Sequence, residues 1–154
     1  MFNFFVILSF FISILAFTHD GKNRVKETVS NVALQKINDQ YIKRIKPIFQ
    51  KKCFDCHGSG NQLPWYSNIP GAKQLIQSDI EESKKHMDMS HDFPFLGHGT
   101  PEEDLIALKK MTNEESMPPF RYKLLHWNSS LTENEKKSLH EWIDKGLNTL
   151  NSQN

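Results

Sequence analysis

The stretch Cys53-Phe54-Asp55-Cys56-His57 decides how the rest of this 154-residue chain is interpreted. Cys-x-x-Cys-His is the attachment sequence of c-type haem, in which two thiols bond the porphyrin vinyl groups and the histidine ligates the iron. Cysteines three residues apart lie on one face of a helical turn, so both sulfurs reach the same side of a flat macrocycle. The motif therefore predicts one covalently bound haem c, with its iron, attached at Cys53 and Cys56 and ligated by His57.

Two other kinds of site can be built on a pair of cysteines, a dithiol redox site and half of a zinc site. A zinc site of this type would need two further ligands at finger-like spacing, and the sequence holds only 2 cysteines. A thioredoxin-like dithiol would need a βαβ pattern, whereas the flanking residues are typical of helices. The sequence favours haem over both alternatives.

The amino terminus differs in composition from the rest of the chain. Residues 1–18 carry no charged side chain, and Phe4 to Phe17 is apolar apart from two serines. This run is shorter than the roughly 20 residues of a spanning helix and is typical of an export signal, although the usual basic residue before it is missing. We expect residues 1–18 to be a signal peptide or a retained membrane anchor, residues 19–38 a tether, and residues 39–150 the haem domain.

Export agrees with the motif, since bacteria attach haem covalently on the outer side of the inner membrane. We therefore expect a periplasmic protein that meets the haem-attachment machinery, with membrane association if residues 1–18 are retained. The 19 basic residues nearly balance the 18 acidic ones, so nothing indicates a nucleic-acid partner.

Helical periodicity and helix caps recur along the mature chain. Apolar residues are spaced as in a helix from Val32 to Ile48, and Pro47 indicates a break or a new helix start there. Residues 72–86 form a further predicted helix. Thr100 and Thr132 each begin a capping box, and the second of these helices is expected to stop near Gly146. No stretch alternates as a strand does. The predicted fold is all-α and cytochrome c-like, with four to five short helices around one haem.

The apolar faces of the last three predicted helices are expected to point inward. Their residues are Leu75, Ile76 and Ile80; Leu105, Ile106, Leu108 and Met111; and Leu139, Trp142 and Ile143.

The second axial ligand of the iron is expected to be Met117. The two prolines that follow it fix the backbone in an extended form, so the thioether can be aimed at the iron at little entropic cost. Met87 and Met89 are rivals, and a histidine or an open position is a further alternative. Met111 is expected to belong to a helix core.

Several further pieces of the chain resemble the small exported haem-binding domains of bacteria, which are cytochrome c-like. They are Ile45-Lys46-Pro47-Ile48-Phe49, the Cys53–His57 motif, Pro64-Trp65-Tyr66-Ser67, Asp79-Ile80, Met117-Pro118, the stretch from Tyr122 to His126, and Leu131-Thr132. The resemblance covers about two-thirds of the chain. It implies a monohaem domain with His57 on one side of the iron and Met117 on the other.

Other side chains are expected to donate hydrogen bonds to the haem propionates. Trp65 and Arg121 are the candidate hydrogen-bond donors, because a buried propionate needs donors or an arginine.

A His/Met-ligated iron leaves no position for substrate, so we expect a monohaem cytochrome that carries single electrons between exported or membrane-bound redox partner proteins.

Two other functions are compatible with a haem domain of this kind, a sensor and a peroxidase. The methionine- and histidine-rich stretch from His86 to His98 motivates a haem-based sensor with a labile or absent sixth ligand. The chain is not expected to be an enzyme, because no acid–base pair suited to a peroxidase is evident beside an open iron position.

Overall fold

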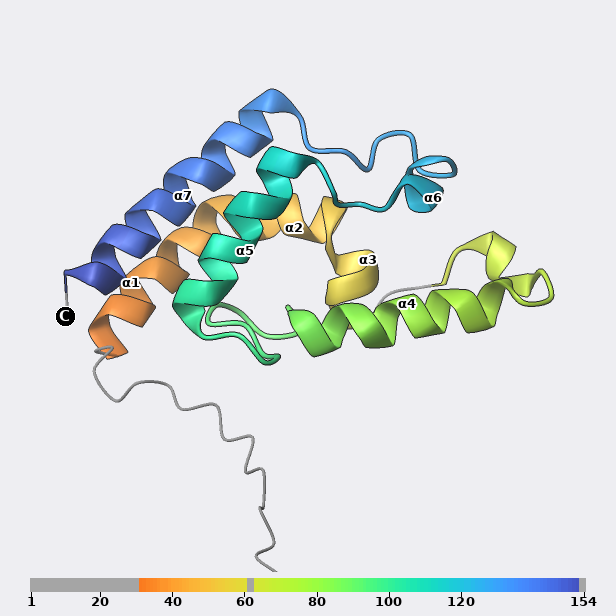
Figure 1. Cartoon of the computed structure of the whole chain (residues 1–154), viewed down its shortest axis with the longest axis horizontal. Helices are drawn as coiled ribbons and strands as arrows, with labels where there is room; N and C mark the ends of the chain where they lie inside the picture. Colours follow the sequence, from red (N-terminus) through yellow and green to blue (C-terminus); the bar gives the residue numbers. More distant parts are fainter. Residues whose placement is uncertain (1–30, 61–62, 153–154) are drawn as a thin grey trace, which may run out of the picture.

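The computed structural model describes residues 31–60 and 63–152, and all of its regular elements are helical. The elements are α1 (Asn31–Gln40), the π-helical turn η1 (Tyr41–Ile45), α2 (Lys46–Lys52), α3 (Phe54–His57), the 3-10 helix η2 (Trp65–Asn68), α4 (Ala72–His86), α5 (Pro101–Glu114), α6 (Phe120–Lys123) and α7 (Glu133–Asn151). Figure 1 shows α7 lying along α1 and α5, with α3, α4 and α6 on the other side of the molecule. The predicted all-α fold is confirmed.

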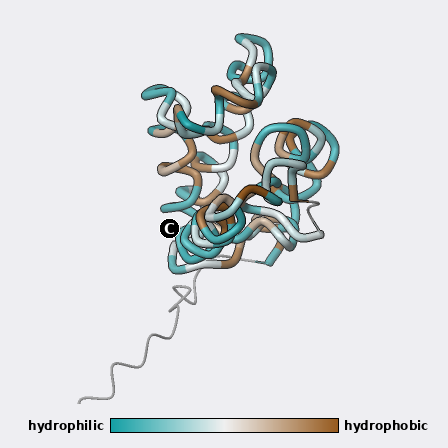
Figure 2. The backbone as a smooth tube through the Cα atoms, turned by 90° about the vertical axis from the view of Figure 1, so that its right-hand side faces the viewer, coloured by the Kyte–Doolittle hydropathy of each residue, from teal (hydrophilic) through white to brown (hydrophobic). Residues whose placement is uncertain are grey.

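The core forms where α1, η1, α5 and α7 meet. Tyr41, Phe49 and Trp142 are almost fully buried there, and their rings meet edge-on or tilted at centroid distances of 5.8–6.5 Å. Such ring contacts stabilise a core beyond the area that they bury. Hydrophobic residues recur along the helices with hydrophilic residues between them, as Figure 2 shows, which is the pattern of helices with one buried side.

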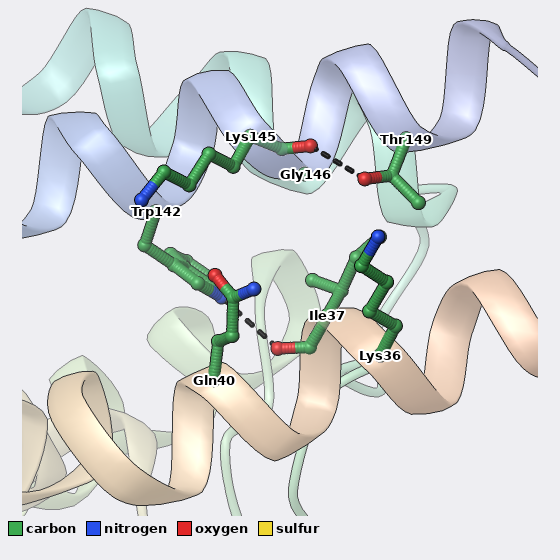
Figure 3. Close-up of a pocket in the computed structure, with 7 residues that line it drawn as sticks. All are labelled: Lys36, Ile37, Gln40, Trp142, Lys145, Gly146 and Thr149. Atoms are coloured by element: carbon green, nitrogen blue, oxygen red, sulfur yellow. Dashed lines mark hydrogen bonds between the residues drawn. The ribbon is translucent and has the colours of Figure 1, made fainter.

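One hydrogen bond ties α1 to α7 inside this core. The indole Nε1 of Trp142 donates to the carbonyl oxygen of Ile37 at 3.1 Å. Figure 3 shows this bond at the bottom of a small depression between the two helices. Because neither helix carries the Cys53–His57 motif, the depression is unrelated to the predicted haem site.

Pro47 is accommodated by a change of helix type. A proline cannot donate the hydrogen bond that continues an α-helix. The chain passes through the π-helical turn η1 just before it, where the backbone N–H of Lys46 donates to the carbonyl oxygen of Tyr41, and α2 then begins at Lys46. The new helix start that the sequence predicted at Pro47 is therefore confirmed.

Both predicted capping boxes are present. In each, the threonine hydroxyl accepts a backbone N–H three residues on, and the glutamate there accepts the N–H of the threonine. The end predicted near Gly146 is wrong, since α7 continues to Asn151. A Cβ at Gly146 would lie 2.8 Å from Leu105 Cδ1, so this glycine lets α5 approach α7 rather than ending the helix.

Some expectations from the sequence need correction, and others lie outside the described residues. Helix α4 has the predicted bounds, but it has no buried residue, and Leu75 is 54% exposed; Ile106 of α5 is 51% exposed. The tether expected over residues 19–38 overlaps α1, where Ala33 and Ile37 are buried in the core. The expectations for residues 1–18, and for the tether up to residue 30, lie outside the described residues. Within residues 31–60 and 63–152, no helix is both long and apolar enough to cross a membrane.

Candidate haem site

The Cys53–His57 motif begins at Cys53, directly after α2, and its other four residues form the single helical turn α3. The backbone N–H of Cys53 donates to the carbonyl oxygen of Phe49 at 2.8 Å, and that of His57 donates to the carbonyl oxygen of Cys53 at 3.0 Å. These bonds hold Cys53 and Cys56 on one turn with their thiols free. This is the arrangement that lets two sulfurs reach one side of a porphyrin.

Burial keeps both thiols protonated. It raises the pKa of Cys53 to about 12, and it also raises the pKa of Cys56 above its ordinary value, with the nearby Asp55 and Asp79 carboxylates adding to the effect. Cysteines used in dithiol exchange have lowered pKa values, because the thiolate is the nucleophile. The electrostatics of this pair therefore disfavour the dithiol alternative.

The imidazole of His57 is oriented by the backbone of a distant segment. Its Nδ1 lies 2.7 Å from the carbonyl oxygen of Met87, and a carbonyl oxygen only accepts, so Nδ1 carries the proton. Burial lowers the pKa of His57, which favours the neutral ring. In that tautomer Nε2 keeps its lone pair. A histidine that ligates a metal commonly donates its other N–H in this way, which fixes the ring and raises its basicity.

A second backbone bond closes the same contact, since the N–H of Met89 donates to the carbonyl oxygen of His57 at 2.8 Å. The side chains of Met87 and Met89 are buried in the hydrophobic core. The role of the Met87 carbonyl was not predicted from the sequence. No residue type could have indicated it, because every residue has the same backbone carbonyl group.

Met117 lies on the segment between α5 and α6, and its side chain is 46% exposed. Side chains just beyond it attach this segment to the haem motif and to α4. The Tyr122 hydroxyl donates to the Asp55 carboxylate inside the motif, and the Arg121 guanidinium donates to both Asp79 oxygens at 2.6 and 3.2 Å. The structure thus brings the neighbourhood of Met117 to the turn that carries the cysteines.

The loop before α7 is attached to the other end of the motif. Lys52, which precedes Cys53, donates through Nζ to the carbonyl oxygens of Asn128 and Ser130, the latter at 2.9 Å. Residues 117–130 are therefore held against the motif at both ends, at Asp55 and at Lys52.

The two predicted propionate donors have different surroundings. Trp65 is 78% exposed and meets Tyr66 edge-on at a ring centroid distance of 5.7 Å. The guanidinium of Arg121 is engaged with Asp79, a partner that the sequence analysis did not foresee.

The apolar surface near the motif suits a porphyrin. Large exposed hydrophobic side chains occur on the two segments that flank α3, and they are Leu63, Trp65, Ile69, Leu75, Met117, Phe120, Leu124, Leu125 and Trp127. Helix α4 packs on α3 and η2 but buries none of its own side chains. Exposed apolar side chains on these segments are of the kind that pack against the faces of a porphyrin. The residues present therefore fit a haem, with Cys53 and Cys56 to hold it and His57 to face its iron.

An all-helical domain with this histidine, these free thiols and this apolar surface defines a haem-binding protein. The chain belongs to the family described as haem-binding domain, whose model matches residues 9–145. It is also 32% identical over 129 residues to the protein named cytochrome c peroxidase Ccp of Escherichia coli (strain K12). That alignment covers 82% of this chain but only 27% of the relative. No solved structure matches the chain.

The relative overturns one expectation. We expected the chain not to be an enzyme, and that prediction is wrong, because a protein of 32% identity that covers most of the chain is named a peroxidase. No acid–base pair suited to a peroxidase is evident in the sequence of this chain, but the chain spans only 27% of the relative's length.

Proposed function

We propose that this chain attaches one haem c through Cys53 and Cys56, ligates its iron with His57 and Met117, and carries single electrons. The observation that carries the proposal is the hydrogen bond from His57 Nδ1 to the Met87 carbonyl oxygen, at 2.7 Å, which leaves Nε2 for the iron. When bound, the haem supplies one-electron chemistry, as its iron alternates between the ferrous and ferric states. The chain's own residues orient the haem, keep water from it and set the reduction potential of its iron.

The choice of Met117 over its rivals is supported by where the three methionines lie. Met87 and Met89 are 8% and 3% exposed, inside the hydrophobic core, on the segment that binds the Nδ1 side of His57. Met117 is 46% exposed on a segment anchored to the motif through Tyr122. The Met117 side chain is therefore not taken up by the hydrophobic core, unlike those of Met87 and Met89.

We further propose that these electrons serve peroxide reduction. Hydrogen peroxide takes up two electrons and two protons to give two molecules of water, so a peroxide-reducing centre needs two one-electron deliveries per turnover. In the relative that is named a peroxidase, the region similar to this chain makes up 27% of the protein's length. Electron supply to a peroxide-reducing haem is a role that suits a domain of this kind.

A second candidate is peroxide reduction at the haem of this chain itself. It is favoured by the name of the relative and by the exposure of Met117, because a methionine that leaves the iron opens a position for peroxide. The same opening would serve the sensor function that was the alternative on sequence grounds.

We propose that the domain lies in the periplasm, where the haem-attachment machinery attaches its haem and redox proteins are its partners. Residues 1–18 would then be a leader or an anchor. These proposals depend on the sequence of the amino terminus and on the chemistry of haem attachment.

The test uses full-length protein made in a host with haem-attachment machinery. Wild-type protein should keep its haem after denaturation and show the far-red band of methionine-ligated ferric haem. Met117→Ala should lose that band and lower the reduction potential by on the order of 0.1 V, since axial ligands move haem potentials over about 0.8 V. Met89→Leu, a volume-conserving change in the core, is the matched control and should alter neither.

Three outcomes separate the candidates. A colourless product with the mass of the bare polypeptide rejects haem attachment. An unchanged spectrum in Met117→Ala rejects this methionine as ligand. Steady peroxide consumption by the isolated wild-type chain, with a chemical reductant, would favour the second candidate over electron delivery.

A further inference from the structure

Two histidines outside the haem motif are placed opposite each other by backbone pairing. Asp88 and Leu96 form an antiparallel β-bridge, with N···O distances of 2.6 and 3.0 Å between their backbones. Each histidine lies two residues outside this bridge, His86 before Asp88 and His98 after Leu96, and their imidazole rings are in contact.

The backbone next to His98 lies close to the end of α4. A Cβ at Gly97 would lie 2.8 Å from the carbonyl oxygen of His86, and Gly97 has a φ of +127°, a conformation that residues other than glycine rarely adopt. Glycine at this position therefore allows residues 97–98 to approach the end of α4 closely. His86 is the last residue of that helix.

The two imidazoles meet through one nitrogen each. His86 Nδ1 and His98 Nε2 are 3.0 Å apart, the ring planes are at 86°, and the ring centroids are 5.0 Å apart. Two imidazole nitrogens on a tetrahedral zinc, each at about 2.0–2.1 Å, are separated by about 3.3 Å. The observed N···N distance is about 0.3 Å shorter than that separation.

The other nitrogen of His86 already has the partner that a metal-binding histidine requires. Its Nε2 lies 3.2 Å from Glu82 Oε1, one helical turn earlier in α4. A carboxylate on the second nitrogen of a histidine fixes its orientation and makes it a stronger ligand. The other oxygen of Glu82 is bonded to Lys85 at 3.1 Å, which holds the carboxylate in place.

We propose that His86 and His98 bind a divalent transition-metal ion of the zinc class, with Glu82 as the carboxylate that orients His86. Imidazole nitrogens suit zinc, copper and nickel rather than calcium or magnesium. Within residues 31–60 and 63–152, no group of three or more His, Cys, Asp or Glu side chains is arranged to hold a metal ion, so water completes the coordination. The side chain of His86 is 63% exposed, which gives the ion and its water molecules access.

The site adjoins the element that holds the haem histidine. His86 directly precedes Met87, whose carbonyl oxygen accepts a hydrogen bond from His57 Nδ1 at 2.7 Å, so the pair of histidines lies next to the segment that orients the haem histidine. A dication between His86 and His98 therefore disfavours added positive charge on the haem iron and raises its reduction potential. This coupling rests on the proposed ligation by His57, whereas metal binding itself does not.

The test is a calorimetric titration of the haem-loaded full-length protein with zinc chloride. Thioether bonds to haem remove both cysteines as competing ligands. We expect one zinc per chain in the wild type, with affinity at least tenfold lower in His86→Asn and in His98→Asn. Glu82→Gln should lose about 10- to 100-fold, as is usual for a carboxylate behind a metal-bound histidine. His91→Asn, which changes an exposed histidine of the same region, is the control and should bind as the wild type does.

Potentiometry of the same samples tests the coupling. Zinc should raise the haem potential of the wild type and of His91→Asn and leave that of His98→Asn unchanged. Equal zinc affinity in the wild type and in both His86→Asn and His98→Asn would overturn the site, as would an absence of zinc binding. A zinc-bound wild type with an unmoved potential would overturn the coupling.

Discussion

The hydrogen bond between Tyr122 and Asp55 links the segment that bears Met117 to the haem motif, 67 positions earlier in the chain. Burial and the nearby Asp55 carboxylate both raise the pKa of Tyr122, so the hydroxyl stays protonated and donates. Replacement by phenylalanine removes the donor and keeps the ring, which stacks on His126 at a centroid distance of 3.8 Å. The change therefore isolates the bond from the packing around it.

A hydrogen bond to a charged group contributes about 1.5–3 kcal/mol when shielded. Asp55 is exposed, so about 1 kcal/mol is the appropriate value here, or roughly a fivefold change in an equilibrium constant. If that energy holds the segment closed, Tyr122→Phe raises the open fraction about fivefold. An added ligand that competes with Met117 should then bind about five times more tightly.

The assay is a spectroscopic titration of the ferric haem-loaded protein with imidazole. Tyr66→Phe is the matched control, because Tyr66 contacts His126 through its ring and lies in the same aromatic cluster. Its imidazole affinity should equal that of the wild type. Equal affinities in Tyr122→Phe and the wild type would refute the reasoning, even if the variant unfolds at a lower denaturant concentration, because the bond would then stabilise the fold without governing access to the iron.

Two further predictions concern the stability of the fold. Burial, reinforced by the adjacent Glu103, raises the pKa of Asp104 to about 7 from an unfolded value of 3.8, so the folded chain holds a proton there that the unfolded chain has lost. The free energy of unfolding should therefore fall by up to about 1.4 kcal/mol for each pH unit between about pH 4 and 7. In urea unfolding, Asp104→Asn should lack this pH-dependent decrease. An identical pH profile in the two proteins would contradict the prediction. The hydroxyl of Tyr41 is fully buried and has no hydrogen-bond partner in the part of the chain that the structure describes. Tyr41→Phe should therefore raise the free energy of unfolding by about 1 kcal/mol in urea unfolding. A loss of stability in this variant would show that the hydroxyl has a hydrogen-bond partner after all.

Local signals in the sequence predicted the helices well. The capping boxes at Thr100 and Thr132 and the proline at residue 47 gave helix starts that the structure has, since these depend on interactions within a few residues. The predicted inward face of α4 failed for a physical reason. Its apolar side chains are spaced as in a buried helix, but none of them is buried by the part of the chain that the structure describes, and we propose that the haem packs against them.

The sequence alone determined the cofactor class, because Cys53, Cys56 and His57 are placed by one helical turn and need no distant residue to be recognised. Only the tertiary structure decided how that histidine is held, since its partner is the backbone carbonyl of Met87, 30 positions away. The same holds for the pairs Arg121–Asp79 and His86–His98. Such contacts depend on where the folded chain returns to itself, which neither residue type nor local spacing encodes.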